Sequence, residues 1–207
     1  MKLEHLLVGP LQSNCFILGD EKTGEAVVID PGGDGALIID RIKSRPWNVI
    51  AILVTHAHFD HVGANADIVE ATGAPLMVPR PCVALLDQAA EQAGMYGLEV
   101  KPSPRPDRLL DDGDTVTVGG ETIEVISTPG HSPGGVTFRT SIGIFPGDAL
   151  FAGSIGRTDF PGSDFSTLIR SIKERILVLP DDTHVYPGHG PETTVGRERR
   201  HNPFLQG

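Results

Sequence analysis

Cysteine and aromatic residues are scarce in this chain. Only Cys15 and Cys82 occur among its 207 residues, and Phe, Trp and Tyr together make up 5%. Two cysteines do not build the framework of a small disulfide-stabilised domain, so we interpret both thiols as buried or inert. With so few aromatic rings, the core must consist mainly of Leu, Ile, Val and Ala side chains.

Positive charge is also in short supply. The sequence has 17 Lys and Arg residues against 27 Asp and Glu residues, and its formal net charge is −10. Proteins that bind nucleic acid need a basic face to neutralise phosphates. The charge balance therefore excludes nucleic acid as the principal partner.

Long apolar runs are missing as well. Residues 1–10 lack the apolar centre of a signal peptide and break at Pro10, and no later run has the length of a membrane span. From these features we expect a cytoplasmic protein without a membrane partner. The sequence leaves its oligomeric state open.

The order of the expected elements favours an α/β protein. A chain of this length can form one domain with a substantial core, so we expect residues 1–207 to form a single domain. The Pro-rich segment 101–108 reads as a loop within that domain. Mixed sheets covered by helices are the natural packing for this order. From apolar periodicity we expect strands at 3–8, 15–18, 26–29, 49–54, 76–78, 115–118, 122–127, 136–140, 142–145 and 183–186, and helices at 34–43, 60–71, 82–93 and 164–179.

Three histidines and an aspartate crowd into one short stretch after the apolar run 49–54: His56, His58, Asp60 and His61. Solvated loop histidines are common singly, but this number at this spacing indicates metal ligands. The run reads as a buried strand, so the ligands lie on a turn at its carboxyl end, where open α/β sheets place their active sites.

Three further candidate ligands follow strands in the second half of the chain. His131, Asp148 and His189 each come after an apolar strand and directly after a glycine. Glycine lets the backbone turn sharply beside a metal, and the strand end fixes the direction of the side chain. Together with the His-rich turn, these residues form a strong constellation.

The pattern His-x-His-x-Asp-His, followed by His131, Asp148 and His189, resembles the metallo-β-lactamase superfamily. The chain is most similar there to the hydroxyacylglutathione hydrolases (glyoxalase II) and their short relatives, through residues 13–16, 29–32, 156–161, 186–191 and 196–204. The resemblance implies a four-layer αββα sandwich. It further implies that one metal is bound by His56, His58 and His131, that a second is bound by Asp60, His61 and His189, and that Asp148 bridges the two.

The chemistry of these ligands agrees with hydrolysis. Imidazoles and carboxylates suit two divalent metals, with zinc as first choice and iron or manganese as alternatives. Such a pair can activate a hydroxide for attack on an acyl carbon, with Asp60 and Asp148 as the catalytic carboxylates. A thiolate leaving group departs without a strong acid, which favours a thioester over an amide. The excess positive charge of the metals favours a small anionic substrate such as the glutathione conjugate S-lactoylglutathione.

Two other residues carry weaker expectations. Asp30 either supports the ligand turn from behind or caps its own turn. Arg157 either holds a substrate carboxylate, as a basic residue of this loop does in glyoxalase II, or pairs with Asp159 to order the loop. Both alternatives stay open for each residue.

Two alternatives to thioester hydrolysis remain. A persulfide dioxygenase, a mononuclear iron enzyme of the same superfamily, shares the Gly-Arg-Thr-Asp-Phe pattern of residues 156–160. Those enzymes typically have Tyr-Pro-Ala-His-Asp-Tyr after the last strand, where this chain has Tyr-Pro-Gly-His-Gly-Pro at 186–191, and the difference favours hydrolysis. A metal-binding protein without catalysis is the third hypothesis, which the complete ligand set disfavours.

Overall fold

Two six-stranded sheets form the centre of the computed structural model, which describes residues 1–206. The first sheet has the order β1-β2-β3-β4-β5-β6, antiparallel through β3 and parallel from β3 to β6. Its strands are β1 (Lys2–Val8), β2 (Ser13–Gly19), β3 (Glu25–Ile29), β4 (Asn48–Leu53), β5 (Leu76–Pro79) and β6 (Arg108–Leu110).

The second sheet has the order β14-β13-β10-β9-β8-β7, and only its β10–β13 pair is parallel. A two-stranded ribbon of β11 (Leu150–Phe151) and β12 (Ser154–Ile155) follows β10. The strands of the second sheet are β7 (Thr115–Val118), β8 (Glu121–Ser127), β9 (Val136–Thr140), β10 (Gly143–Gly147), β13 (His184–Pro187) and β14 (Thr193–Thr194).

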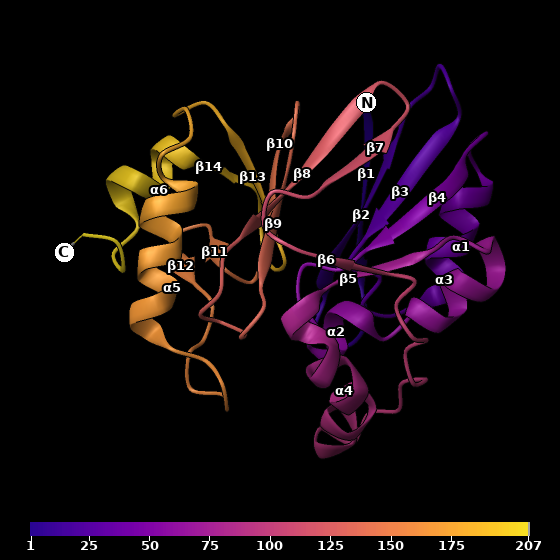
Figure 1. The fold of residues 1–207 in the computed structure, drawn as a ribbon, viewed down its shortest axis with the longest axis horizontal. Helices are drawn as coiled ribbons and strands as arrows, with labels where there is room; N and C mark the ends of the chain where they lie inside the picture. The colour runs from indigo at the N-terminus through magenta and orange to yellow at the C-terminus, as the bar shows by residue number, and fades with distance from the viewer. Residues whose placement is uncertain (207) are drawn as a thin grey trace.

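Helices cover the outer face of each sheet (Figure 1). On the first sheet lie α1 (Gly35–Lys43), α2 (Phe59–Val62), α3 (Asn65–Thr72) and α4 (Val83–Met95), the last preceded by a 3₁₀ turn over Arg80–Cys82. On the second sheet lie α5 (Phe165–Ser171), which continues into a π-helical turn (Ile172–Ile176), and α6 (Val195–His201). None of the helices within residues 1–206 has the length and apolar character that crossing a membrane requires.

Strict alternation of side chains along the strands produces the four layers. In β2, Phe16 and Leu18 pack into the core between the sheets, whereas Ile17 packs into the core beneath the helices. In β3, Val27 faces the second sheet and Val28 the helices. Because a strand turns successive residues to opposite faces, strands that are apolar on both faces need a covering layer on each side. The αββα fold expected for this chain is therefore confirmed.

The expected helix over 60–71 is wrong in one respect, because the structure has two helices there. α2 ends at Val62, and α3 begins at Asn65. Between them, Gly63 packs so closely against the loop after β3 that a Cβ atom would lie 2.5 Å from the carbonyl oxygen of Gly32. This close approach shapes the chain directly behind the candidate metal ligands.

The short strands β6, β11, β12 and β14 were not expected from the sequence. Each has only two or three residues, too few for a period-2 pattern to show. β6 begins at Arg108, where the expected Pro-rich loop ends, and pairs with β5 through Val78 and Leu109. Long-range pairing, not local sequence, therefore creates these elements.

Phe138 offers a test of the core between the sheets, because its ring on β9 is fully buried there. We expect Phe138→Ala to lower the free energy of unfolding by about 3–5 kcal/mol, through lost burial and the cavity it leaves. Phe165→Ala, at a ring that is 52% exposed, should change it by less than about 0.5 kcal/mol. Denaturant unfolding at equal metal content measures both, and equal effects would contradict the packing described.

Candidate metal centre

The seven candidate ligands lie on loops that follow strands of both sheets. The turn with His56, His58, Asp60 and His61 follows β4 of the first sheet, and α2 carries the last two. His131 follows β8, Asp148 follows β10 and His189 follows β13, all in the second sheet. The structure thus brings together side chains that lie up to 133 positions apart in the sequence, between His56 and His189.

His56, His58 and His131 form the first set of converging side chains. One ligand atom of each lies within 4.8 Å of the others. The Nδ1 atom of His58 is 2.9 Å from the Nε2 atom of His131, and the ring of His56 stands nearly perpendicular to both other rings. Three imidazole nitrogens that point at a common centre can occupy three of the four positions of a tetrahedral metal site.

Asp60, His61 and His189 form the second set, again with ligand atoms within 4.8 Å of one another. The Oδ2 atom of Asp60 lies 3.0 Å from Nε2 of His189 and 3.6 Å from Nε2 of His61. His61 is fully buried, whereas the His189 side chain is 28% exposed. This set therefore opens toward solvent on the side of His189.

Asp148 lies between the two sets. Its Oδ2 atom is 3.6 Å from Nε2 of His131 in the first set and 3.7 Å from Nε2 of His189 in the second. Its Oδ1 atom is 3.3 Å from Nε2 of His61. A carboxylate in this place can contact two cations at once, which is the position that the family resemblance implied for Asp148.

Unpaired polar atoms support a metal at this place. Nε2 of His56, Nε2 of His61 and Oδ1 of Asp148 are buried, and none of them makes a hydrogen bond. An unpaired polar atom in a protein interior costs on the order of 1–3 kcal/mol. All three belong to the seven candidate ligands, and bound cations would satisfy them. The residues present thus fit a metal centre.

Burial and neighbouring charges shift the pKa values of the histidines in opposite directions. Burial is the main reason that the pKa of His56 is lowered, and it holds the pKa of His58 at about 4. For His61 burial acts in the same direction, but the carboxylates of Asp148 and Asp60 together outweigh it and raise its pKa. The carboxylates thus favour positive charge at His61, which is the charge that a bound cation would supply.

Asp30 connects both sets from behind. Its Oδ2 atom lies 3.0 Å from Nδ1 of His61 and accepts a hydrogen bond from Oγ1 of Thr55 at 2.6 Å. Its Oδ1 atom accepts from the backbone N–H of Thr55 at 2.7 Å. Nδ1 of His56 is in turn 3.1 Å from Oγ1 of Thr55. With its oxygens so engaged, Asp30 orients one histidine of each set.

Ser13 and Asn14 also support the centre, and sequence reasoning gave them no role. Ser13 donates a hydrogen bond from Oγ to Oδ2 of Asp60 at 3.0 Å. Asn14 donates from Nδ2 to the carbonyl oxygens of Pro187 and Gly190, on either side of His189. Both are buried at the start of β2. The signal was a pair of polar residues before an apolar strand, whose partners lie too far along the chain to be inferred.

Close backbone approach explains two of the glycines beside the ligands. Gly147 has a φ of +51°, a left-handed conformation that glycine adopts without strain. At Gly188, a Cβ atom would lie 2.1 Å from Oδ1 of Asp148 and 2.7 Å from the His61 ring. The strand–glycine–ligand pattern thus has a steric reason as well as a conformational one.

Arg157 and Phe160 lie at the mouth of the centre, on the segment between β12 and α5. The carbonyl oxygen of Arg157 lies 2.8 Å from Nδ1 of His131, and its guanidinium pairs with Asp159 at 2.7 Å. That guanidinium also lies over the Phe160 ring, 4.5 Å from its centre. The ion pair expected as one alternative is present, yet the Arg157 side chain is 64% exposed and within reach of a ligand.

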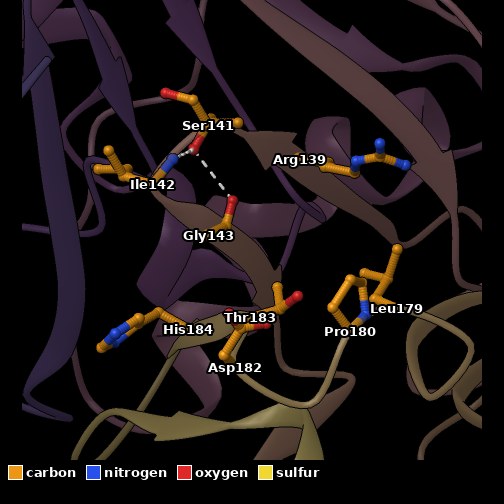
Figure 2. Close-up of a pocket in the computed structure, with 10 residues that line it drawn as sticks. Arg139, Ser141, Ile142, Gly143, Leu179, Pro180, Asp182, Thr183 and His184 are labelled. Atoms are coloured by element: carbon orange, nitrogen blue, oxygen red, sulfur yellow. Dashed lines mark hydrogen bonds between the residues drawn. The ribbon is translucent and has the colours of Figure 1, made fainter.

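A hollow of about 290 Å³ lies at the other end of the second sheet (Figure 2). It is lined by residues at the starts of β10 and β13, among them Gly143 and His184, whereas Asp148 and His189 follow the opposite ends of these strands. None of the candidate metal ligands lines it. We therefore place the chemistry at the histidine cluster, where titratable groups converge.

Comparison with known proteins agrees with this fold and this site. The family model of the metallo-β-lactamase superfamily matches residues 8–189. The chain therefore belongs to this superfamily of metal-dependent proteins. Its structural similarity extends to a crystal structure described as BLEG-1 B3 metallo-β-lactamase, with a TM-score of 0.93, 39% identity and 100% of both chains covered.

Individual relatives share the full length of the chain. A probable metallo-hydrolase, YqgX of Bacillus subtilis, is 40% identical and covers 100% of this chain and 99% of its own. A hydroxyacylglutathione hydrolase, GloC of Haemophilus influenzae, is 38% identical over 99% of this chain and 98% of its own. Among solved structures, TTHA1623 in a di-iron-bound form has a TM-score of 0.90 at 41% identity, and the match covers 98% of this chain and 100% of that one. The structure of ETHE1 from Myxococcus xanthus has a TM-score of 0.82 at 29% identity, and the match covers 98% of this chain and 84% of that one.

Asp30→Asn tests the support behind both ligand sets. An amide keeps the shape of the side chain and tolerates the left-handed backbone of Asp30, with φ +52°, but loses one of the acceptor oxygens. We expect metal affinity to fall about 10–100-fold, measured by competition with a chelator. Asp111→Asn, at an exposed ion pair with Arg80, is the control and should leave affinity unchanged. Unchanged affinity in Asp30→Asn would refute the supporting role.

Proposed function

We propose that the protein is a dinuclear metal-dependent thioester hydrolase that cleaves S-lactoylglutathione or a similar acyl-glutathione to a hydroxy acid and glutathione. The observation that carries the proposal is the pair of three-residue ligand sets with Asp148 between them. The name of the Haemophilus influenzae relative, a hydroxyacylglutathione hydrolase, supports the choice of substrate.

In this proposal His56, His58 and His131 hold one divalent ion, Asp60, His61 and His189 hold the other, and Asp148 holds both. Zinc is our first choice, and the di-iron form of TTHA1623 keeps iron as an alternative beside manganese. When bound, such a pair lowers the pKa of a water molecule and polarises the substrate carbonyl.

The protein's own groups fix the geometry of the reaction. Asp60 receives a hydrogen bond from Ser13 and contacts His189, so its carboxylate has a fixed direction in which it can orient the attacking water. Contacts at Nδ1 hold the rings of His61 and His131, through Asp30 and the carbonyl of Arg157. Groups held in this way lose little freedom when the transition state forms.

A thiolate leaving group matches the groups that the site provides. With a reference pKa near 8.5, a thiol departs as the anion without a strong general acid. Neither cysteine competes as a nucleophile, because burial raises the pKa of Cys82 to about 12 and raises that of Cys15 as well. The reaction therefore proceeds by direct attack of water on the acyl carbon.

Persulfide oxidation is the second candidate. The Gly-Arg-Thr-Asp-Phe pattern of residues 156–160, which resembles that of persulfide dioxygenases, favours it. The complete second ligand set, with Asp60 and His189, favours hydrolysis instead, because a mononuclear iron site has no use for it. Iron content and oxygen uptake with glutathione persulfide separate the two.

The direct test is hydrolysis of S-D-lactoylglutathione by the metal-loaded protein. We expect efficient turnover, and we expect His58→Ala and Asp148→Ala to lose metal and reduce kcat/KM by about 10³-fold or more, since several kcal/mol of transition-state stabilisation depend on the metals. His184→Ala, an exposed histidine stacked on Tyr186 outside the cluster, is the control. Full activity of Asp148→Ala without bound metal would sink the proposal.

Arg157 is proposed to bind a carboxylate of the glutathione moiety. Arg157→Ala should raise KM about tenfold with little change in kcat, the modest effect expected for an exposed charged hydrogen bond. Asp159→Asn should lower KM, because it frees the guanidinium from its partner. Arg139→Ala, at an exposed arginine in the hollow at the other end of the sheet, serves as control. Equal KM values in all variants would exclude the role.

A further inference from the structure

Glu198 is a buried acidic residue on α6 that the proposed mechanism leaves without a function. Its side chain is buried, with the residue 1% exposed. Its Oε1 atom accepts a hydrogen bond from Oγ1 of Thr193 at 2.6 Å. Its Oε2 atom accepts from the backbone N–H of Gly153 at 2.8 Å and from Nδ2 of Asn202 at 2.9 Å. All three donors are neutral groups. A carboxylate in the interior is costly even with such donors around it, so its position calls for a reason.

Two of these contacts bind the tip of the two-stranded ribbon formed by β11 and β12. Gly153, whose φ is +72°, lies in the turn between the strands and donates its N–H to Glu198. Asn202 donates from Nδ2 to the carbonyl oxygen of Ser154 at 2.9 Å. Figure 1 shows the ribbon on the side of the second sheet that α5 and α6 cover, and apolar residues of the ribbon and of both helices share one core. The tip is thus bound to the α6 segment at two consecutive residues.

The other end of the ribbon lies in the metal centre. Asp148, between the two ligand sets, comes two positions before β11, and Arg157 comes two positions after β12. Gly156 lies between them in space. A Cβ atom there would be 1.9 Å from the carbonyl oxygen of Asp148 and 2.9 Å from the His131 ring. The glycine therefore lets both ends of the ribbon pack directly against each other and against a candidate ligand.

Arg157 determines which nitrogen of His131 faces the centre. Its carbonyl oxygen lies 2.8 Å from Nδ1 of His131. A carbonyl oxygen can only accept a hydrogen bond, so Nδ1 carries the hydrogen and Nε2 keeps its lone pair for a cation. A backbone acceptor of this kind fixes the tautomer and the ring orientation of a histidine that binds metal. The position of this carbonyl in turn depends on the ribbon that precedes it.

We propose that Glu198 is a positioning residue for the metal centre: it holds the tip of the ribbon and thereby fixes the Arg157 carbonyl that orients His131. The inference rests on the metal part of the proposed function and is independent of the substrate. Because its donors are neutral, Glu198 acts as a hydrogen-bond acceptor and not through its charge. A glutamine can accept the same two N–H groups with its amide oxygen, while the Thr193 hydroxyl turns to accept from the amide nitrogen.

Zinc affinity, measured by competition with a chelator, tests the positioning role. We expect Glu198→Ala to weaken zinc binding about tenfold, the lower end of what loss of a partner behind a metal ligand costs. Glu198→Gln should restore binding to within about twofold of the wild type, because it keeps the acceptor. Val195→Ala is the matched control on the same helix. It truncates a fully buried apolar side chain and should lower the melting temperature, but it removes no hydrogen bond from the ribbon and should leave zinc affinity unchanged.

The visible absorption of the cobalt(II)-loaded protein gives a second readout, which responds to ligand geometry and not to stability alone. Glu198→Ala should change the position or intensity of the cobalt bands, whereas Glu198→Gln and Val195→Ala should keep the wild-type spectrum. Asn202→Ala provides a milder variant if Glu198→Ala does not fold. It removes the bond to Ser154 and leaves that of Gly153, so it should weaken zinc binding about threefold and alter the spectrum in the same direction.

The outcomes separate this inference from the proposed function. Wild-type affinity and spectrum in both Glu198→Ala and Asn202→Ala, or an equal loss in Val195→Ala, would overturn the positioning role and leave the proposed function standing. Equal losses in Glu198→Ala and Glu198→Gln would also overturn it, because the side chain would then act through its charge. Glu198-dependent metal binding in a protein that does not hydrolyse S-D-lactoylglutathione would overturn the proposed function and keep the positioning role.

Discussion

The buried carboxylate of Asp30 is the contact on which the centre depends. A charge in the interior is tolerated only where donors surround it, and here the donors are the backbone and hydroxyl of Thr55 and the ring of His61. Through Thr55 the same carboxylate also reaches His56. One acidic group at the end of β3 thereby fixes histidines of both ligand sets on the loop after the neighbouring parallel strand β4.

The cluster gathers groups that repel one another unless something compensates them. Five imidazoles surround two carboxylates, and the pKa directions diverge, lowered at His56 and His58 but raised at His61 and His189. That divergence follows the carboxylates, which lie nearest the second set. The lowered pKa values favour neutral imidazoles in the first set, and the carboxylates favour positive charge in the second. Such a cluster of buried polar groups would destabilise an ordinary protein core, but it can bind metal ions.

Local pattern predicts the ligands but not the groups that hold them. Asp148 and His189 could be found from sequence because each follows an apolar strand and a glycine, and such a turn is encoded within a few residues. Ser13 and Asn14 could not be found, since each acquires meaning only from a partner distant in the chain, Asp60 for the first and the carbonyl oxygen of Pro187 for the second. The break between α2 and α3 escaped for the same reason, because the backbone N–H of Ala64 donates to the carbonyl oxygen of the distant Pro31.

In the proposed reaction, substrate specificity must come from residues around the metal centre, because the centre itself would recognise only a carbonyl and negative charge. Proteins similar to this chain include one named a hydroxyacylglutathione hydrolase and one described as a B3 metallo-β-lactamase, so membership of the family does not by itself define the substrate. The segment between β12 and α5 contacts the centre, because the ring of Phe160 lies 5.4 Å from that of His58 and 6.3 Å from that of His131. Arg157 connects this segment to the centre, since its carbonyl holds His131 while its guanidinium faces outward. A substrate carboxylate bound by that guanidinium would therefore also hold the backbone that contacts a metal ligand. Recognition of the glutathione moiety would in this way be coupled to the geometry of the reaction.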